Sequence, residues 1–172
     1  MLIIIMGVTG AGKTTLGVQL ARAYGATFHD ADDYHSASAI AKMKNGEPLT
    51  DVDRASWLER LESIIVEMGS GGPRVLACSA LRGVYRSRLR AAAKVAGIET
   101  LFVYLRVSPE VATSRLQDRR GHFMPASLVE SQFATLEEPD EAIVLDGTAA
   151  PEVLVGEILT ALKVRQGVRR GI

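Results

Sequence analysis

The sequence predicts a single α/β domain built around a parallel β-sheet. Short apolar runs of strand length alternate with amphipathic stretches of helix length, and a glycine-rich motif directly follows the first apolar run. Strands that alternate with helices are typical of parallel sheets. The runs expected to form strands are residues 2–6, 26–28, 75–80, 100–107 and 142–146.

The first run, LIIIM, is expected to be a core strand rather than a targeting or membrane segment. It carries no basic n-region and is far shorter than the roughly 20 apolar residues needed to cross a bilayer. The clearest helix pattern is WLERLESIIVEM at 57–68, whose apolar residues fall on one stripe. We expect one domain over residues 1–165 and a flexible tail over 166–172, where this periodicity is lost.

Composition excludes several classes of protein. The chain has 20 basic and 20 acidic residues, and this balance argues against coating nucleic acid or an anionic membrane through bulk charge. Its single cysteine, Cys78, lies in an apolar run and is expected to be a small buried hydrophobe. We therefore expect a cytoplasmic protein with no nucleic-acid or membrane partner.

The strongest functional signal is GVTGAGKTT, which follows the first strand and begins the first helix. It satisfies the P-loop pattern G-x-x-x-x-G-K-[ST]. Glycines let the backbone N–H groups form an anion nest, and the helix start adds its positive dipole end. Lys13 is expected to contact the β- and γ-phosphates of ATP or GTP and to act in catalysis, and Thr14 to bind Mg²⁺. The expected nucleotide-binding residues are Gly7, Val8, Thr9, Gly10, Ala11, Gly12, Lys13, Thr14 and Thr15.

The second strand runs into HDADDYH at 29–35, which has three interpretations. A magnesium and proton-transfer site would use Asp30 as a metal ligand and Asp32 as the base that accepts a hydroxyl proton, because alternate strand residues share one side. A zinc site is less favoured because structural zinc usually requires thiolates. A solvated acidic turn is the third interpretation, and Asp33 is expected to cap a helix that begins near Tyr34.

Two further segments place charged residues near helix starts. In EPLTDVDRASWL, Thr50 or Asp51 is expected to cap a helix, and Asp51 fits capping and substrate binding equally well. Arg54 is expected to bind an acidic or polyhydroxy acceptor. In CSALRGVYRSRLR, Ser79 ends a strand, and Arg82 and Arg86 follow it at the sheet edge where ligands bind, so both are expected to grip an anionic acceptor.

SRLQDRRGHFMP is expected to be a mobile lid at about 117–127. Arg115 and Arg119 lie four residues apart on a helix that breaks at Gly121 and Pro125. Lid arginines can cover the nucleotide and neutralise charge on the transferring phosphoryl group, so Arg119 is also a catalytic candidate. His122 fits a substrate donor and a packed aromatic equally well.

Several motifs occur together in one order: GVTGAGKTT, FHDADDYH, KMKNGEPLTDVDRASWL, CSALRGVYR, RLQDRRGHFMP and SQFATLEEP. Over about residues 3 to 139 this pattern resembles the gluconokinases. The resemblance implies a P-loop NTPase fold like that of the nucleoside monophosphate kinases, with a five-stranded parallel sheet flanked by helices and a mobile lid. It also implies a homodimer that uses ATP and Mg²⁺ to phosphorylate the 6-hydroxyl of D-gluconate.

The same resemblance implies a set of substrate contacts. Arg86 is the first choice for the gluconate carboxylate, within a basic pocket that also holds Arg54, Arg82 and His122. His35 is a further substrate contact, and Gln132 fits a substrate contact and a helix-face amide about equally.

Two rival functions stay open. One is a kinase for another small acid, such as shikimate, and the other is a nucleotide-binding regulatory module that has lost phosphoryl transfer. A regulatory module would be free to lose the base and the lid arginines, so the full set favours catalysis. The residues of this full set, all present in the sequence, are Lys13, Thr14, Asp30, Asp32, Arg115 and Arg119.

Overall fold

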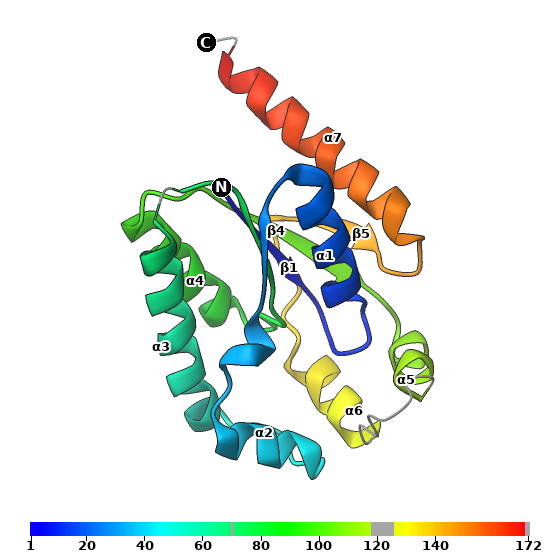
Figure 1. The fold of residues 1–172 in the computed structure, drawn as a ribbon. Helices are drawn as coiled ribbons and strands as arrows, with labels where there is room; N and C mark the ends of the chain where they lie inside the picture. The colour runs from blue at the N-terminus through cyan, green and yellow to red at the C-terminus, as the bar shows by residue number, and fades with distance from the viewer. Residues whose placement is uncertain (70, 118–125, 171–172) are drawn as a thin grey trace.

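A five-stranded parallel sheet in the order β2-β3-β1-β4-β5 forms the centre of the chain (Figure 1). The structure is a computed structural model that describes residues 1–69, 71–117 and 126–170. Every strand pair is parallel, which confirms the predicted α/β class. The strands are β1 (Leu2–Met6), β2 (Thr27–Asp30), β3 (Arg74–Ala77), β4 (Thr100–Arg106) and β5 (Ala142–Asp146).

Helices cover both faces of this sheet (Figure 1). One face packs against α1 and α7, and the other packs against α3 and α4. The helices are α1 (Lys13–Tyr24), α2 (Ala37–Lys44), α3 (Asp51–Met68), α4 (Gly83–Val95), α5 (Pro109–Gln117), α6 (Ala126–Thr135) and α7 (Pro151–Arg170), with the short 3-10 helix η1 (Ala31–Tyr34) after β2.

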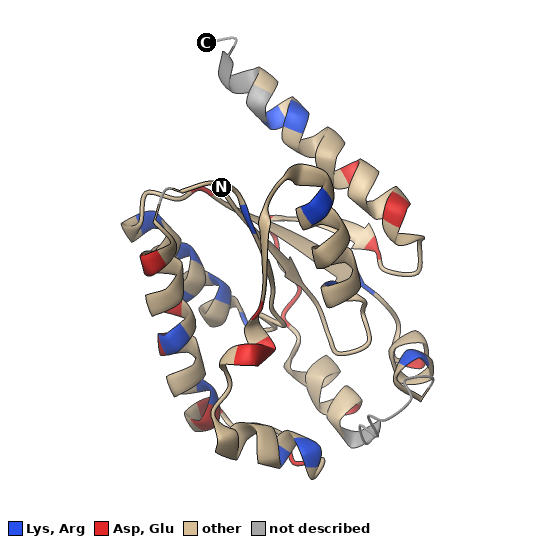
Figure 2. Cartoon of the chain, in the orientation of Figure 1, with Lys and Arg blue, Asp and Glu red and all other residues tan. Residues whose placement is uncertain are grey.

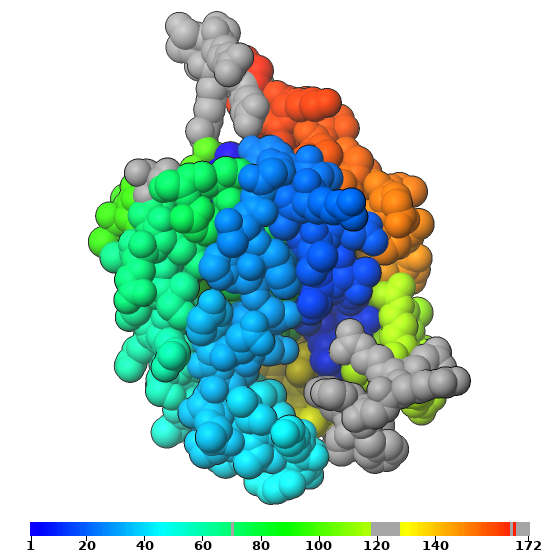
Figure 3. Space-filling view, in the orientation of Figure 1, coloured from blue at the N-terminus to red at the C-terminus, as the bar shows by residue number. Residues whose placement is uncertain are grey.

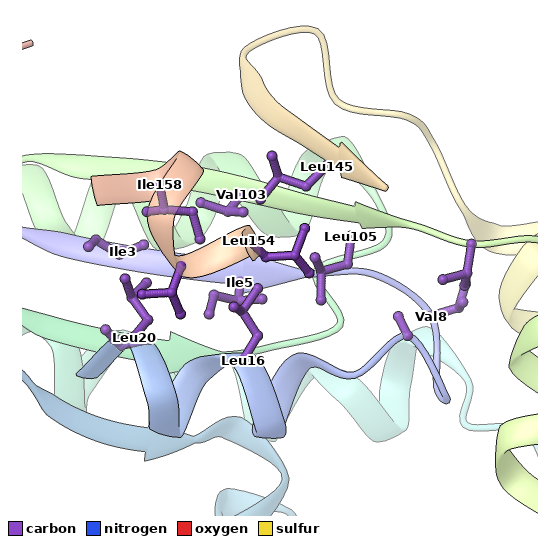
Figure 4. Packing of buried hydrophobic residues seen from close by; sticks show 14 of the residues in the cluster. Ile3, Ile5, Val8, Leu16, Leu20, Val103, Leu105, Leu145, Leu154 and Ile158 are labelled. Carbon is purple, nitrogen blue, oxygen red and sulfur yellow. The ribbon is translucent and has the colours of Figure 1, made fainter. Parts of the chain in front are cut away.

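The central strand β1 shows why its sequence is apolar throughout. Ile3 and Ile5 pack among the residues of α1 and α7 (Figure 4). Ile4 packs among the residues of α3 and α4 on the other face. Successive side chains of a strand point to opposite faces, and here both faces are covered, so every residue of β1 is fully buried. Cys78 belongs to the second cluster, and its burial raises the pKa of its thiol to about 12.

The strand ends differ from the prediction in an informative way. β2 continues to Asp30, which brings its acidic end into the sheet, whereas β3 ends at Ala77 although the apolar run continues to residue 80. The chain still follows β1 for two residues: the Cys78 N–H donates to Ile5 O at 3.0 Å, and Ser79 O accepts from the Gly7 N–H at 3.3 Å. It then turns at Ala80, whose φ is +43°.

Helix starts correct one prediction and confirm another. The capping role predicted for Asp33 is wrong, because α2 begins later and its cap is Ser36, whose hydroxyl accepts from the Ala39 N–H at 3.2 Å. Thr50 caps α3, as expected for one of two candidates, in a capping box with Asp53. Asp51 is therefore not the cap.

The last helix is longer than the periodicity predicts. α7 continues to Arg170, past residue 166 where we expected the tail to begin. Among the described side chains, its last buried residue is Leu162, so the apolar stripe ends where the sequence pattern ends. No helix in the described part of the chain has the length and apolar character of a membrane span.

Two helical glycines provide a matched test of this packing. A Cβ on Gly17 would lie 2.5 Å from Cε2 of Phe28, whereas one on Gly156 in α7 would meet nothing within 4 Å. We expect Gly156→Ala to raise the free energy of unfolding by about 0.5–1 kcal/mol through helix propensity. Gly17→Ala should instead lower it by about 1–3 kcal/mol through overpacking. Urea denaturation measures the free energy of unfolding of both variants. An equal increase in the two would contradict the close packing of α1 on β2.

Candidate active site

The P-loop, residues 7–15, joins β1 to α1. At two of its glycines, neighbouring backbone atoms leave no space for a side chain. A Cβ on Gly7 would lie 2.8 Å from Leu105 O, and one on Gly10 would lie 2.6 Å from Ala112 O. Both have positive φ, +143° and +77°, which side chains rarely adopt. Lys13 reaches back over the loop, and its Nζ donates to Val8 O at 3.0 Å. The loop therefore has the geometry of an anion nest at a helix start.

Thr14 and Asp30 meet beside this loop, as the sequence predicts. The Thr14 hydroxyl donates to Asp30 Oδ2 at 2.8 Å, and Asp30 Oδ1 accepts from the Asp32 N–H at 3.1 Å. A hydroxyl and one carboxylate suit Mg²⁺, which is usually held by one or two carboxylates together with substrate phosphates and water. These two residues therefore fit a magnesium ion.

The two histidines of HDADDYH contact different neighbours. His29 Nδ1 lies 3.3 Å from the Tyr34 hydroxyl, whereas His35 stacks on Trp57 with ring centroids 4.8 Å apart. Within residues 1–69, 71–117 and 126–170, no three His, Cys, Asp or Glu side chains gather as a metal-holding group.

A cavity beside the P-loop brings together seven of the predicted site residues. Figure 3 shows α6 in yellow at the back of a recess bordered by the dark-blue N-terminal segment and by α2 in cyan. The cavity lies at the carboxyl edge of the sheet, where ligands of parallel α/β proteins bind. The predicted residues that line it are Thr9, Lys13, Asp32, His35, Arg54, Ser79 and Gln132.

Asp32 and His35 both line this cavity and lie close to each other. The Asp32 side chain is 74% exposed, and its Oδ1 lies 4.0 Å from Nε2 of His35, whose side chain is only 6% exposed. Burial lowers the pKa of His35, Asp32 raises it by less, and Arg54 lowers it further. His35 is therefore neutral near pH 7, while Asp32 faces the open space.

Asp51 and Arg82 are not among the residues that line this cavity, and their predicted contact with substrate stays a prediction. Arg82 Nη1 donates to Asp51 Oδ2 at 2.5 Å, and the Tyr85 hydroxyl donates to Asp51 Oδ1 at 2.5 Å. These hydrogen bonds, from Tyr85 and then Arg82, lower the pKa of Asp51. The group joins the starts of α3 and α4 and holds Tyr85, which does line the cavity.

Arg86 lies outside this cavity and contacts the backbone of a turn. Its Nη1 donates to Ala80 O at 3.1 Å and to Leu81 O at 3.0 Å. It lines a different hollow, shared with Gly83, Phe102 and Asp140, and not the one that contains Asp32. The carboxylate contact expected of Arg86 stays a prediction, and among the described residues Arg54 is the arginine that lines the cavity.

Arg115 contacts the P-loop backbone. Its Nη1 donates to Ala11 O at 3.2 Å, and its Nη2 donates to Gly147 O at 2.8 Å. A second cavity between the P-loop and the start of α7 is lined by Arg115, Thr15, Gly147, Ala149 and Pro151, among others. Arg115 thus joins the phosphate loop to the segment after β5.

Gln132 lies on α6, and its side chain is engaged. Its Oε1 accepts from the Thr9 N–H at 2.7 Å, so it supports the P-loop while lining the cavity. Arg119, His122 and most of the predicted lid fall within 118–125, outside the described residues.

Sequence reasoning misses several parts of the site. The helix pattern places Trp57 only on a core stripe, yet Trp57 lines the cavity and its Nε1 donates to Ala31 O at 2.8 Å. Tyr85 lies in the CSALRGVYR motif, one position before Arg86. Gly147 has no local motif, but a Cβ there would lie 2.6 Å from Cγ1 of Val107, so this position has to be small.

Charge across the molecule is mixed, and both signs occur along α3 and α7 (Figure 2). Lys42 and Asp53 illustrate this pairing at the surface, with Nζ and Oδ1 2.6 Å apart. Selective recognition must therefore come from the few charges that face the cavities.

A phosphate nest, a hydroxyl beside a carboxylate, and an adjoining polar cavity are the features of a P-loop kinase of small molecules. A family model described as an AAA domain matches residues 2–139. A probable gluconokinase of Xenopus tropicalis is 43% identical over 173 residues, which cover 92% of this chain and 91% of that protein. The gluconokinase of Gluconobacter oxydans strain 621H is 41% identical over 161 residues, covering 91% of this chain and 88% of that protein.

A solved structure agrees with these relatives. The crystal structure of a gluconokinase from Sinorhizobium meliloti 1021 is 36% identical and has a TM-score of 0.85, covering 98% of this chain and 95% of that one. The chain belongs to the gluconokinase family.

The lowered pKa of His35 predicts a pH dependence of stability. The unfolded chain takes up a proton near the ordinary histidine pKa of 6.5, whereas folded His35 takes it up only at lower pH. The free energy of unfolding should therefore fall as pH drops through 6.5. His35→Phe keeps a ring against Trp57 and should lose less stability than the unaltered protein between about pH 8 and pH 5.5. Equal losses in urea denaturation at the two pH values would contradict the buried neutral imidazole.

Proposed function

We propose that this protein transfers the γ-phosphoryl group of ATP to the 6-hydroxyl of D-gluconate, giving 6-phospho-D-gluconate and ADP. The observation that carries the proposal is that one cavity is lined both by Lys13 of the P-loop and by Asp32 and Arg54. A phosphate donor and an acidic acceptor can therefore meet there. Relatives named gluconokinase at 41–43% identity support the same substrate.

ATP would bind with its phosphates in the P-loop nest and its base in the second cavity. That cavity runs along Gly10 and Gly12 to Arg115, Ala149 and Pro151, so it adjoins the phosphate nest. Lys13 would then contact the β- and γ-phosphates as a point charge.

Thr14 and Asp30 would hold the magnesium ion, because their oxygens already lie 2.8 Å apart beside the nest. When bound, the ion neutralises charge on the phosphates that the protein's own donors do not reach.

D-gluconate would bind between the P-loop and α3. Arg54, with a side chain only 19% exposed, supplies the positive charge for the carboxylate. Ser79 and Tyr85 offer hydroxyls for the polyol, and Trp57 offers an apolar wall for its carbon chain. This arrangement would direct the far end of the sugar acid toward Lys13 and Asp32.

Asp32 would accept the proton of the 6-hydroxyl. The hydroxyl oxygen forms a bond to the γ-phosphorus, the bond from that phosphorus to the β–γ bridging oxygen breaks, and ADP leaves with the electron pair. The proton passes to the Asp32 carboxylate. Because such transition states are loose, Asp32 contributes by orienting the hydroxyl as well as by accepting its proton.

The convergence of separate residues supports catalysis over a regulatory role. Lys13, Thr14, Asp30 and Asp32 come from two segments and lie around one nest and one cavity. The roles of Arg119 and the lid, and the homodimer, stay predictions.

An acceptor panel tests the proposal directly. ADP release with Mg-ATP is measured for D-gluconate, other aldonic acids, shikimate and no acceptor. We expect turnover with D-gluconate well above every other compound. Higher turnover with another acid would change the proposed substrate and leave the proposed kinase activity in place. ATP binding without acceptor-dependent turnover would favour the regulatory module.

Asp32 and its neighbour Asp33 offer a matched pair of variants. Both are exposed, but only Asp32 lines the cavity. We expect Asp32→Asn to lower kcat by roughly 10²–10⁴-fold, the usual contribution of a general base, with little change in ATP affinity. Asp33→Asn should leave kcat within about twofold. A kcat for Asp32→Asn within about tenfold of the unaltered protein would remove the general-base role.

A further inference from the structure

The turn between β3 and α4 has an unusual backbone. Ala80 is the one residue other than glycine with positive φ in the described part of the chain, at +43°, and it is completely buried. Alanine disfavours this left-handed conformation because its Cβ crowds the neighbouring carbonyl oxygen. Such a conformation persists only where surrounding contacts hold it.

Those contacts come from Arg86 and Glu137. One guanidinium nitrogen of Arg86 donates to the carbonyl oxygens of both Ala80 and Leu81, at 3.1 and 3.0 Å. From the other side, the Glu137 N–H donates to Leu81 O at 2.9 Å, and its Oε2 accepts from the Gly83 N–H at 2.6 Å. The turn is thus held between a cation on α4 and the segment that follows α6.

The turn directly follows a residue that touches both parts of the site. Ser79 lines the cavity that also contains Asp32 and Arg54, which is called the acceptor cavity below. The carbonyl oxygen of Ser79 accepts from the N–H of Gly7, the first residue of the P-loop. A relaxed turn at Ala80 would move Ser79 and loosen Gly7 together. Arg86 itself does not line the acceptor cavity, so its influence on the site runs through this turn.

We infer that Arg86 is a positioning residue that holds Ala80 in its left-handed turn and thereby fixes Ser79 and the entry to the P-loop. Its guanidinium suits this role because it stays charged and presents several donors in a rigid plane. Burial lowers the pKa of this guanidinium, and the carboxylates of Glu137 and Asp140 offset part of that effect. The effect on turnover rests on the proposed function, whereas the effect on the backbone does not.

The test combines two substitutions, one that removes the Arg86 guanidinium and one that lets residue 80 adopt its turn without that guanidinium. Arg86→Ala takes away both hydrogen bonds, and Ala80→Gly lets the turn adopt positive φ without the Cβ conflict. The four proteins of this double-mutant cycle are compared with Arg90→Ala, which removes an arginine one turn later that pairs with Glu141 at 3.4 Å. Arg90 does not line the acceptor cavity.

The first measurement is amide hydrogen exchange of the protein without ligand, by NMR. The N–H groups of Gly7 and Glu137 report the two sides of the turn. In Arg86→Ala we expect both to exchange about tenfold faster or more, as for loss of a hydrogen bond from a charged donor. The double variant should return both to within about threefold of the unaltered protein, and Arg90→Ala should not change them.

The second measurement is turnover of D-gluconate. We expect Arg86→Ala to lower kcat by about tenfold or more, and Ala80→Gly to restore most of the loss. A raised KM for D-gluconate with unchanged kcat and unchanged amide exchange would overturn the inference. It would instead support the expected contact of Arg86 with the gluconate carboxylate. Unchanged exchange in Arg86→Ala, or no rescue by Ala80→Gly, would overturn it as well.

Two further outcomes are decisive. If none of the proteins phosphorylates D-gluconate, the proposed function fails, and rescue of the exchange rates still supports the inference. If Arg86→Ala does not fold, a folded double variant supports the inference, and failure of both to fold contradicts it.

Discussion

The position of the phosphate nest depends on how β1 is held between its two neighbours. On one side, the Cys78 N–H and Ser79 O continue the hydrogen bonds of β3 along β1 and onto Gly7. On the other side, Leu105 of β4 approaches Gly7 so closely that a Cβ would lie 2.8 Å from its carbonyl oxygen. All five residues of β1 are buried, so the core encloses this strand on both faces of the sheet. The core thus places the first glycine of the P-loop.

Around that fixed loop, charged side chains divide into those that pair with one another and those that face the cavities. Asp53 is engaged by Lys42 and by Thr50, which lowers its pKa, and Asp51 is engaged by Tyr85 and Arg82. Asp32, by contrast, lies 4.0 Å from a neutral histidine and is largely exposed. Paired groups shape the walls of the site, and the more open carboxylate is available for chemistry. The same division explains why a chain with no net charge can still recognise an anion.

The turn at Ala80 joins the two halves of the site. A residue other than glycine in this conformation costs roughly 1–3 kcal/mol, which the contacts of Arg86 and Glu137 offset. Glu137 also lies 3.6 Å from Nε of Arg82, so the turn, the start of α4 and the segment after α6 form one connected unit. Through Ser79, this unit borders both the P-loop and the acceptor cavity.

The sequence by itself determined the five strands and the P-loop between strand and helix. It also narrowed the cap of α3 to Thr50 or Asp51 and assigned Thr14 and Asp30 to the same magnesium ion. These features follow from apolar periodicity, from short motifs, and from the convergence of parallel strands at one sheet edge. Only the tertiary structure decided where the arginines point. Arg82 donates a hydrogen bond to Asp51, 31 positions away, and Arg86 donates to backbone carbonyl oxygens at the turn of Ala80. Periodicity shows which residues share a helix face, but how that helix is rotated against the sheet, and hence which partner each charge meets, is set by packing between distant segments.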